Sequence, residues 1–106
     1  MKKNIINKKI NIYIGLEEQK TYKKISKQKA LKVISQEFIN IGIIGFNVSP
    51  INGYWNTKKE ASLLISFINT FKITEKDLNK CIENIKMRLN QEAILKEIQP
   101  LSYAFI

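Results

Sequence analysis

Apolar and polar residues alternate near the start of the chain. In residues 10–16, INIYIGL, isoleucine occupies positions 10, 12 and 14. This period of two predicts a half-buried strand, because successive side chains of a strand point to opposite faces of the sheet. Tyr13 is out of phase with the isoleucines, so we expect it on the opposite face.

Two later segments have the period of a helix. Apolar residues follow the N-cap candidate Ser26 at steps of one to four and precede the C-cap candidate Gly42; they are Ala30, Leu31, Ile34, Phe38 and Ile41. In the second segment, Thr74 and Asp77 resemble a capping box with a shorter acid, and Asn90 is suited to a left-handed stop. Its apolar face consists of Leu78, Cys81, Ile82, Ile85 and Leu89. Both patterns predict amphipathic helices.

Three further segments predict strands. Residues 43–50 form the first, which extends past a bend at Pro50 to Gly53, because proline is tolerated at sheet edges and bulges. Residues 61–69, ASLLISFIN, predict its partner, with the polar residues 57–60 as the hairpin tip. Residues 92–98 predict the last strand, and residues 101–105 form a short extended tail that is able to pair again.

The order of these elements is strand, helix, strand, strand, helix, strand. With right-handed crossovers, this order predicts an α+β, ferredoxin-like βαββαβ fold, in which a four-stranded antiparallel sheet carries both helices on one face. A chain of 106 residues without a Pro/Gly-rich linker or an internal repeat is expected to form a single domain over residues 1–106.

Several short motifs carry a resemblance to a known family. They are YIGL at residues 13–16, GFNVSPINGYW at 45–55, KEAS at 59–62 and RLNQEAILKEIQP at 88–100. Together they resemble a family of small bacterial proteins of unknown function with the pattern Y/F-x-G-L, G-x-W with E-x-S, and F-x-Q-E-A-V-L. Leu89 stands where that pattern prefers an aromatic residue. The resemblance implies a ferredoxin-like fold and supplies no activity.

The chain is basic, with a net charge of +9. Residues 1–32 hold ten lysines against Glu17 and Glu18, a net charge of +8, whereas residues 33–106 hold eight basic and seven acidic residues, a net charge of +1. Ile, Lys and Asn make up 48 of 106 residues, and all three have AT-rich codons, so part of the lysine content reflects genome composition. The basic end is either a solvated face or an anion-binding surface.

The residue types exclude several classes of catalysis. The chain has no His and a single Cys, which excludes Ser-His-Asp and Cys-His nucleophile systems and the usual Cys/His zinc sites. No phosphate-binding glycine motif and no metal-loop spacing of carboxylates is present. We therefore expect no enzyme, no catalytic residue, no metal and no cofactor. No apolar run approaches the ~20 residues of a membrane span, so we expect a cytoplasmic protein that does not contact membranes.

Candidate binding residues are few. The expected ligand-binding residues are Tyr13, Asn47, Tyr54, Trp55, Lys58, Lys59 and Arg88. Trp55 offers a stacking surface or covers the sheet edge, and Arg88, the one arginine, offers a bidentate anion contact or a charge at a helix end. On the sheet face without helices, an interface that makes a homo-oligomer is expected at Tyr13, Leu64, Ser66 and Ile68.

These observations favour a non-catalytic, oligomeric binding protein for a small anionic ligand. The expected ligand bears phosphate and resembles a nucleotide, as for a phage-type sponge that sequesters immune signalling nucleotides. One alternative is a phage-type inhibitor that binds a host protein or a nucleic-acid machine through the basic surface. Another is an RNA-binding domain, although GFNV supplies one aromatic residue where the RNA-recognition fold stacks two or three bases.

Overall fold

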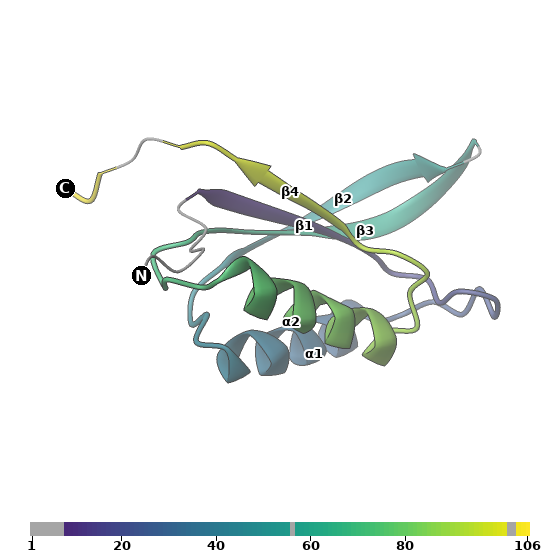
Figure 1. Cartoon of the computed structure of the whole chain (residues 1–106). Helices are drawn as coiled ribbons and strands as arrows, with labels where there is room; N and C mark the ends of the chain where they lie inside the picture. The colour runs from purple at the N-terminus through teal and green to yellow at the C-terminus, as the bar shows by residue number, and fades with distance from the viewer. Residues whose placement is uncertain (1–7, 56, 102–103) are drawn as a thin grey trace.

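Four strands and two helices follow one another in the predicted order. The computed structural model describes residues 8–55, 57–101 and 104–106, without the side chain of Trp55. The elements are β1 (Lys9–Gly15), α1 (Lys27–Asn40), β2 (Asn47–Trp55), β3 (Lys58–Ile68), α2 (Glu75–Arg88) and β4 (Leu95–Gln99). The strands form one antiparallel sheet in the order β2-β3-β1-β4, and both helices lie under the same face (Figure 1). The predicted ferredoxin-like α+β fold is confirmed.

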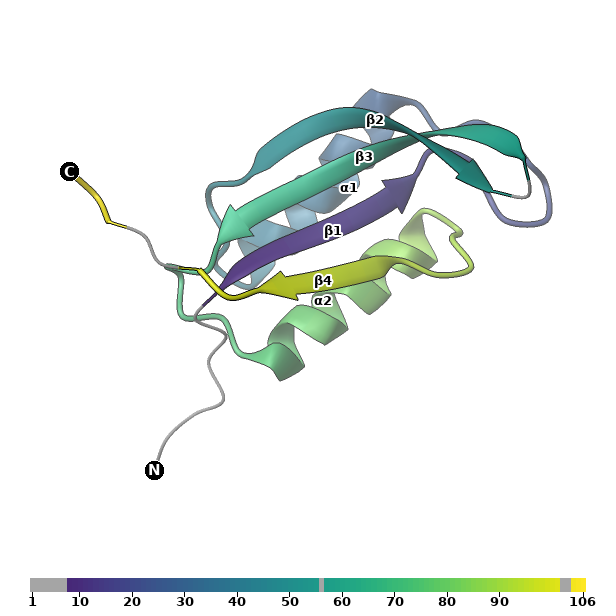
Figure 2. The ribbon, with the colours of Figure 1, turned by 90° about the horizontal axis from the view of Figure 1, so that it is seen from above.

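The core lies between the sheet and the helix layer. β1 runs beside β3 at the centre of the sheet (Figure 2), in a register that places Ile10 opposite Phe67 and Ile12 opposite Ile65. These side chains are buried, as are residues of both helices: Ala30, Ile34, Phe38, Leu78, Cys81 and Ile85. The ring of Phe38 meets that of Phe67 edge to face, with centroids 5.6 Å apart. The period-two pattern of β1 therefore supplies one wall of the core.

The helices begin and end at the predicted signals. The side chains of Ser26 and Thr74 each accept a hydrogen bond from a backbone N–H in the first turn of their helix. Gly42, with φ of 93°, and Asn90, with φ of 51°, turn the chain in the left-handed region just after the helices. Among the described residues, no helix is both long and apolar enough to cross a membrane.

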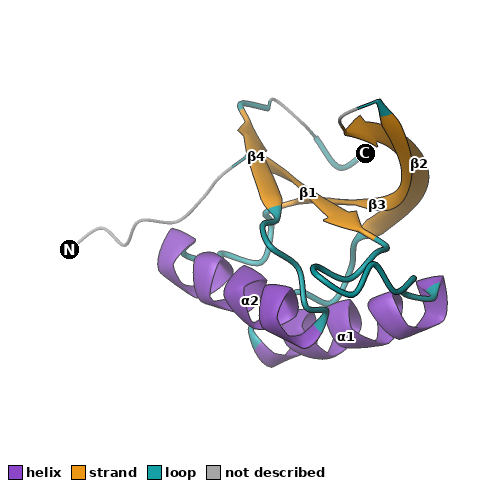
Figure 3. Ribbon diagram, turned by 90° about the vertical axis from the view of Figure 1, so that its right-hand side faces the viewer, coloured by secondary structure: helices purple, strands orange, loops and turns teal. Residues whose placement is uncertain are grey.

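The β2–β3 hairpin lies closer to its turn than predicted, because β2 begins at Asn47 rather than at residue 43 and continues past Gly53 to Trp55. Pairing continues through Tyr54 opposite Lys59 to Trp55 opposite Lys58, so most of the predicted tip at 57–60 belongs to β3. Aromatic side chains favour extended strands, and Thr57, with φ of 64°, turns the chain directly before Lys58. Figure 3 shows this end of β2 and β3 curling away from the helix layer.

The last strand is shorter than predicted. β4 begins at Leu95 rather than at residue 92, because Gln91 and the residues after it form a connection that leads out of the left-handed turn at Asn90. Beyond β4, residues 101 and 104–106 are not in a strand, whereas positions 102 and 103 of the predicted extended tail lie outside the described residues.

Candidate functional site

A cavity of about 800 Å³ opens at the end of the sheet where β1 finishes. Three segments far apart in sequence form its walls: the β1–α1 connection, the start of β3 and the α2–β4 connection. The lining residues are Glu17, Glu18, Gln19, Lys20, Tyr22, Lys58, Glu60, Gln91, Glu92 and Ala93. This volume is typical of a small-molecule site.

The motifs found in the sequence converge on this cavity. Gly15 ends β1 beside it, Glu60 lies in the E-x-S motif of β3, and Gln91 and Glu92 belong to the Q-E-A motif before β4. A Cβ atom on Gly15 would overlap the Glu60 carboxylate and would lie 3.2 Å from Oε1 of Gln91. Glycine at position 15 therefore lets these two side chains approach the backbone of β1. Membership of the family with these motifs stays a prediction.

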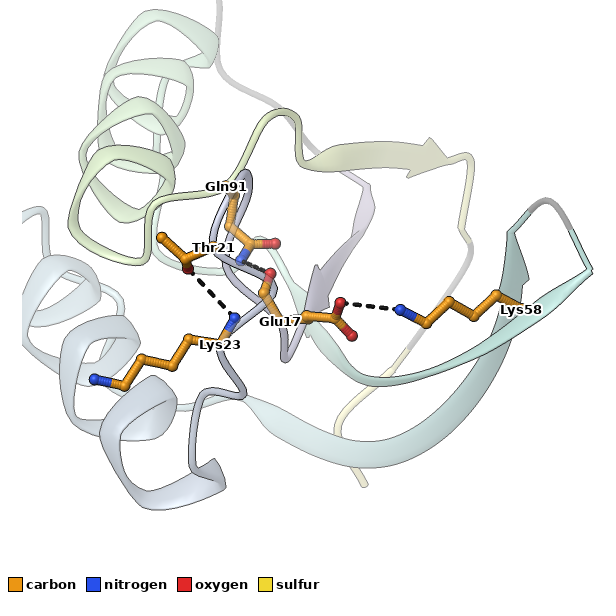
Figure 4. Close-up of polar contacts among 5 residues, drawn as sticks. All are labelled: Glu17, Thr21, Lys23, Lys58 and Gln91. Atoms are coloured by element: carbon orange, nitrogen blue, oxygen red, sulfur yellow. Dashed lines mark hydrogen bonds and ion pairs between the residues drawn. The ribbon is translucent and has the colours of Figure 1, made fainter.

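Gln91 ties two walls of the cavity together. Its Nε2 donates to the backbone oxygens of Glu17, at 3.0 Å, and Leu89, at 3.3 Å. The backbone N–H of Gln19 donates to the oxygen of Asn90 at 2.9 Å. Figure 4 shows Gln91 reaching across to Glu17, while Lys58 approaches Glu17 from the hairpin. The β1–α1 connection is thus fixed to the α2–β4 connection.

The β1–α1 connection is also bonded internally. The N–H of Glu18 donates to the oxygen of Lys23 at 2.8 Å, and the N–H of Tyr22 donates to the oxygen of Glu18 at 3.1 Å. Thr21 Oγ1 donates to the Glu18 carboxylate at 3.0 Å and accepts from the N–H of Lys23. These bonds hold Lys20 and Tyr22 at positive φ, 68° and 55°, a region that side chains of this size rarely adopt. The backbone of Tyr22 is therefore fixed within the loop, while its side chain is 70% exposed.

The cavity is acidic although the chain is basic. It contains four of the nine acidic residues of the chain but two of its eighteen basic residues. One of those two, Lys58, places Nζ 3.3 Å from Oε1 of Glu17 and 5.4 Å from the centre of the Tyr22 ring. No group of three or more His, Cys, Asp or Glu side chains in the described part of the chain is placed to hold a metal ion.

The expected ligand-binding residues are dispersed over the molecule. Lys58 lines the cavity, whereas Lys59, its neighbour in β3, points to the other face of the strand. Tyr54 is exposed on β2, and the side chain of Trp55 lies outside the described structure. Arg88 lies on the helix layer, so the structure does not bring it to Lys58 within one chain. These residues stay predictions as ligand contacts.

Arg88 joins the two helices. Its Nη1 donates to Oε2 of Glu37 at 2.8 Å and its Nη2 donates to Oε1 of Gln36 at 2.7 Å. The Glu37 side chain is 12% exposed and also accepts from Nδ2 of Asn84 at 3.2 Å. Burial and the nearby Glu37 carboxylate together raise the pKa of Cys81 to about 12. The guanidinium thus has a structural partner in α1.

A polar row crosses the sheet face that carries no helices. Strand register places Asn47, Ser66, Asn11 and Glu97 side by side on the four strands. Oε1 of Glu97 accepts from Nδ2 of Asn11 at 2.9 Å and from the hydroxyl of Tyr13 at 3.2 Å. Partial desolvation, and then the Glu97 carboxylate, raise the pKa of Tyr13. Tyr13 and Asn47 share this face as predicted, away from the cavity.

The predicted interface residues lie on the same face. Leu64 pairs with Tyr13 across β3 and β1, Ser66 pairs with Asn11, and Ile68 pairs with Lys9. Leu64, Ser66 and Ile68 are each half-buried within one chain. Their burial by another copy of the chain stays a prediction.

The cavity residues were visible in the sequence only as parts of motifs. Gly15, Glu60, Gln91 and Glu92 belong to the motifs of the family pattern, which predicts architecture alone. A signal was present, because the predicted topology brings the end of the first strand, the start of the third and the segment before the fourth to one edge of the sheet. Glu17, Lys20 and Tyr22 stood in a connection with no distinguishing pattern.

The fold of this chain resembles that of several proteins of known structure. No protein-family model matches the chain, and no curated protein matches its sequence. A phage SAM lyase in its apo state superposes with a TM-score of 0.68 at 17% identity, over 86% of this chain and 78% of the lyase. A phage SAM lyase in complex with S-methyl-5'-thioadenosine gives 0.71 at 15% identity, over 94% and 85%. Arabidopsis thaliana PII bound to citrate gives 0.53 at 15% identity, over 91% and 79%.

These likenesses show a shared fold, which serves both an enzyme and a protein with a bound small molecule. The expectation that the chain is not an enzyme is contradicted by the likeness to a lyase. That expectation rested on the absence of histidine-based and zinc-based sites. A lyase breaks a bond without adding water, so the lack of hydrolase machinery does not exclude it.

Proposed function

We propose that this protein binds S-adenosylmethionine (SAM) in the acidic cavity and cleaves it to S-methyl-5'-thioadenosine. The observation that carries the proposal is the gathering of four carboxylates, Glu17, Glu18, Glu60 and Glu92, around one cavity of a chain with a net charge of +9. SAM bears a sulfonium, an ammonium and one carboxylate, so its net charge is +1. An acidic cavity attracts such a ligand and repels an anion.

The likeness to the phage SAM lyase supports the same ligand class. One of those structures holds S-methyl-5'-thioadenosine, a neutral thioether that contains the adenosine and the methyl group of SAM. At 15–17% identity the likeness concerns the fold, so the proposal depends on the charge and size of the cavity. A ligand the size of SAM fits within a cavity of about 800 Å³.

The proposed reaction breaks the bond between the sulfonium sulfur and the aminobutyrate arm. The carboxylate of the arm attacks the carbon attached to sulfur, a carbon–oxygen bond forms, and the electron pair of the broken bond stays on sulfur. The products are a neutral thioether and a lactone that keeps the ammonium group, so no water or proton is consumed. The protein has to hold the arm in a bent conformation that brings the two reacting atoms together.

The ammonium group is the part of SAM that the carboxylates are suited to hold. Its charge does not change during cleavage, so a carboxylate bound to it stabilises substrate and transition state alike and fixes the arm. A carboxylate at the sulfonium would favour the substrate instead, because that positive charge disappears. We therefore assign the cavity carboxylates to binding and orientation. Glu60, close to the backbone of Gly15, and Glu92 are the carboxylates outside the β1–α1 connection.

The test is a mass-spectrometric assay for S-methyl-5'-thioadenosine after incubation with SAM. Wild type should form this product, and Glu60→Gln and Glu92→Gln should each reduce kcat/KM about tenfold or more, because each removes a charged contact. Glu83→Gln is the matched control, since Glu83 lies on α2 and pairs with Lys86 outside the cavity. Absence of product with a folded wild-type protein, or equal losses in all three variants, would contradict the proposal.

The sequence predicts an anionic, phosphate-bearing ligand, whereas the acidic cavity favours a cationic one. The citrate bound to PII is a polyanion and supports compatibility of the fold with anionic ligands. ATP and cyclic dinucleotides, added to calorimetric titrations beside SAM, separate the two ligand classes. If SAM is the ligand, the phage-type role expected from the sequence becomes removal of SAM.

A further inference from the structure

Two lysines, Lys20 and Lys58, line the acidic cavity, and Lys58 pairs with one of its carboxylates. The ammonium of Lys58 lies 3.3 Å from Oε1 of Glu17 and 5.4 Å from the centre of the Tyr22 ring. A carboxylate beside the face of an aromatic ring is a favourable site for an organic cation. The two groups form what we term the ammonium seat, defined by Glu17 and Tyr22.

The ammonium seat belongs to the β1–α1 connection and does not depend on the hairpin that carries Lys58. Gln91 holds the backbone oxygen of Glu17, and the Glu17 side chain is 18% exposed. The N–H of Tyr22 is bonded to the oxygen of Glu18. The backbone of both residues is therefore held by contacts that do not involve Lys58, and the Tyr22 side chain, 70% exposed, is accessible to a ligand.

The Lys58 side chain is held more weakly than the backbone of Glu17 and Tyr22. Its side chain is 67% exposed and comes from the end of the β2–β3 hairpin. An exposed ion pair and an exposed cation–π contact each contribute little, because water and salt compete for both groups. A second ammonium group that enters the cavity is able to replace it.

We infer that the ammonium seat binds the α-ammonium group of the substrate and that Lys58 is a built-in competitor that substrate displaces. The inference rests on the proposed function. Lys58 occupies the seat with a primary ammonium, which indicates that the ammonium of SAM binds there rather than its sulfonium. A primary ammonium offers N–H donors to the carboxylate, whereas a sulfonium offers none. Lys58 thus lowers the affinity for every ligand that places a primary ammonium group in the seat and leaves ligands without an ammonium group unaffected.

Two ligands and two lysines test the inference by calorimetric titration. S-adenosylhomocysteine keeps the ammonium and, as a neutral thioether, is not cleaved; S-methyl-5'-thioadenosine lacks the arm. Lys58→Met should tighten binding of the first about threefold to tenfold and leave binding of the second unchanged. Lys59→Met is the matched control, since it removes the same charge one residue away on the other face of β3. Tyr22→Leu should weaken binding of the first ligand alone.

Three outcomes overturn the inference: equal effects of Lys58→Met and Lys59→Met, equal effects on both ligands, or weaker binding in Lys58→Met. Failure of SAM cleavage is a separate result, because the titrations need no turnover. If no adenosyl compound binds, n-butylammonium is the probe, with the ring resonances of Tyr22 as the readout in Lys58→Met. If n-butylammonium changes the chemical shifts of the Tyr22 ring, the seat is supported although the proposed function fails. If these shifts do not change, the seat is refuted as well.

Discussion

The middle of the sheet and its cavity end use the same strands for different purposes. In the middle, Ile12 and Ile65 face each other across β1 and β3 and are fully buried under the helices. A few residues further along, β1 ends in Gly15 and β3 begins with Lys58, Lys59 and Glu60. The pattern of apolar side chains stops where the helices no longer cover the sheet. Packing determines the residue types in the first region, but it does not require carboxylates in the second.

This difference separates two kinds of mutational effect. Changes in the helix-covered region should lower the free energy of unfolding and reduce activity only through loss of folded protein. Changes at the cavity end should reduce ligand binding or turnover at nearly constant stability, because most of its side chains are partly exposed.

The largest expected effect is in the core. Phe38→Ala removes a fully buried ring that contacts Phe46 and Phe67, so it should lower the free energy of unfolding by about 3–5 kcal/mol. Ile39→Ala, the adjacent position, should change it by no more than about 0.5 kcal/mol, because Ile39 is 63% exposed. Urea denaturation measures both. Similar losses in the two variants would mean that α1 packs through a different face.

Gly15→Ala should have the next largest effect, on function. The added methyl group would collide with the Glu60 carboxylate, the flexible end of a side chain, which can move away at little cost to folding. We expect turnover of SAM to fall about tenfold with a nearly unchanged melting temperature. Gly45→Ala is the control, because a Cβ there meets only Phe71 at 3.8 Å. Full activity in Gly15→Ala would show that the position of Glu60 is unimportant.

A smaller effect is expected at Arg88, between the helices. Arg88→Met removes the charged partner of the mostly buried Glu37 and should destabilise the fold by about 1 kcal/mol, since Arg88 itself is partly exposed. Lys86→Met, which removes the pair with the exposed Glu83, should be close to neutral. Thermal unfolding compares them. Unchanged stability in Arg88→Met together with weaker ligand binding would return Arg88 to the ligand site.

The smallest effect concerns Tyr13 on the open sheet face. Glu97→Gln removes a nearby negative charge that favours the protonated phenol, so the pKa of Tyr13 should fall. The pKa of Tyr13 is higher in the folded than in the unfolded state. The protonated phenol therefore contributes to folding stability at pH values below its unfolded-state pKa of about 10, and this contribution is lost as the pH rises through the folded-state pKa. NMR titration of the Tyr13 ring measures the change. A Glu83→Gln control should leave it unmoved; a rise in Glu97→Gln would contradict the assignment.

The fold was predictable because local signals agreed with one another. Ile10, Ile12 and Ile14 indicated the strand, Ser26 and Thr74 indicated the helix starts, and the order of elements left one common topology. The ends of β2, β3 and β4 were less accurate. Strand pairing past Tyr54 and the connection after Asn90 depend on contacts between distant segments, which a local pattern does not contain.

The candidate site was predictable only in part. Lys58 was selected for its charge, but its partner Glu17 and the ring of Tyr22 come from a connection whose shape depends on backbone hydrogen bonds. Counting charges along the chain located a basic end, whereas the acidic cavity arises because folding brings Glu60 and Glu92 to the β1–α1 connection. The sign of the local charge is therefore opposite to that of the whole chain.

The most direct test of the central claim is an NMR time course with SAM labelled with carbon-13 in its methyl group. Cleavage in the acidic cavity converts the sulfonium methyl signal into the thioether signal of S-methyl-5'-thioadenosine. The account predicts this conversion with catalytic amounts of wild type and, at SAM concentrations below KM, about tenfold slower conversion with Glu60→Gln. A sulfonium methyl signal that persists unchanged beside the folded protein, or one that only broadens through binding, would contradict the claim that this protein cleaves SAM.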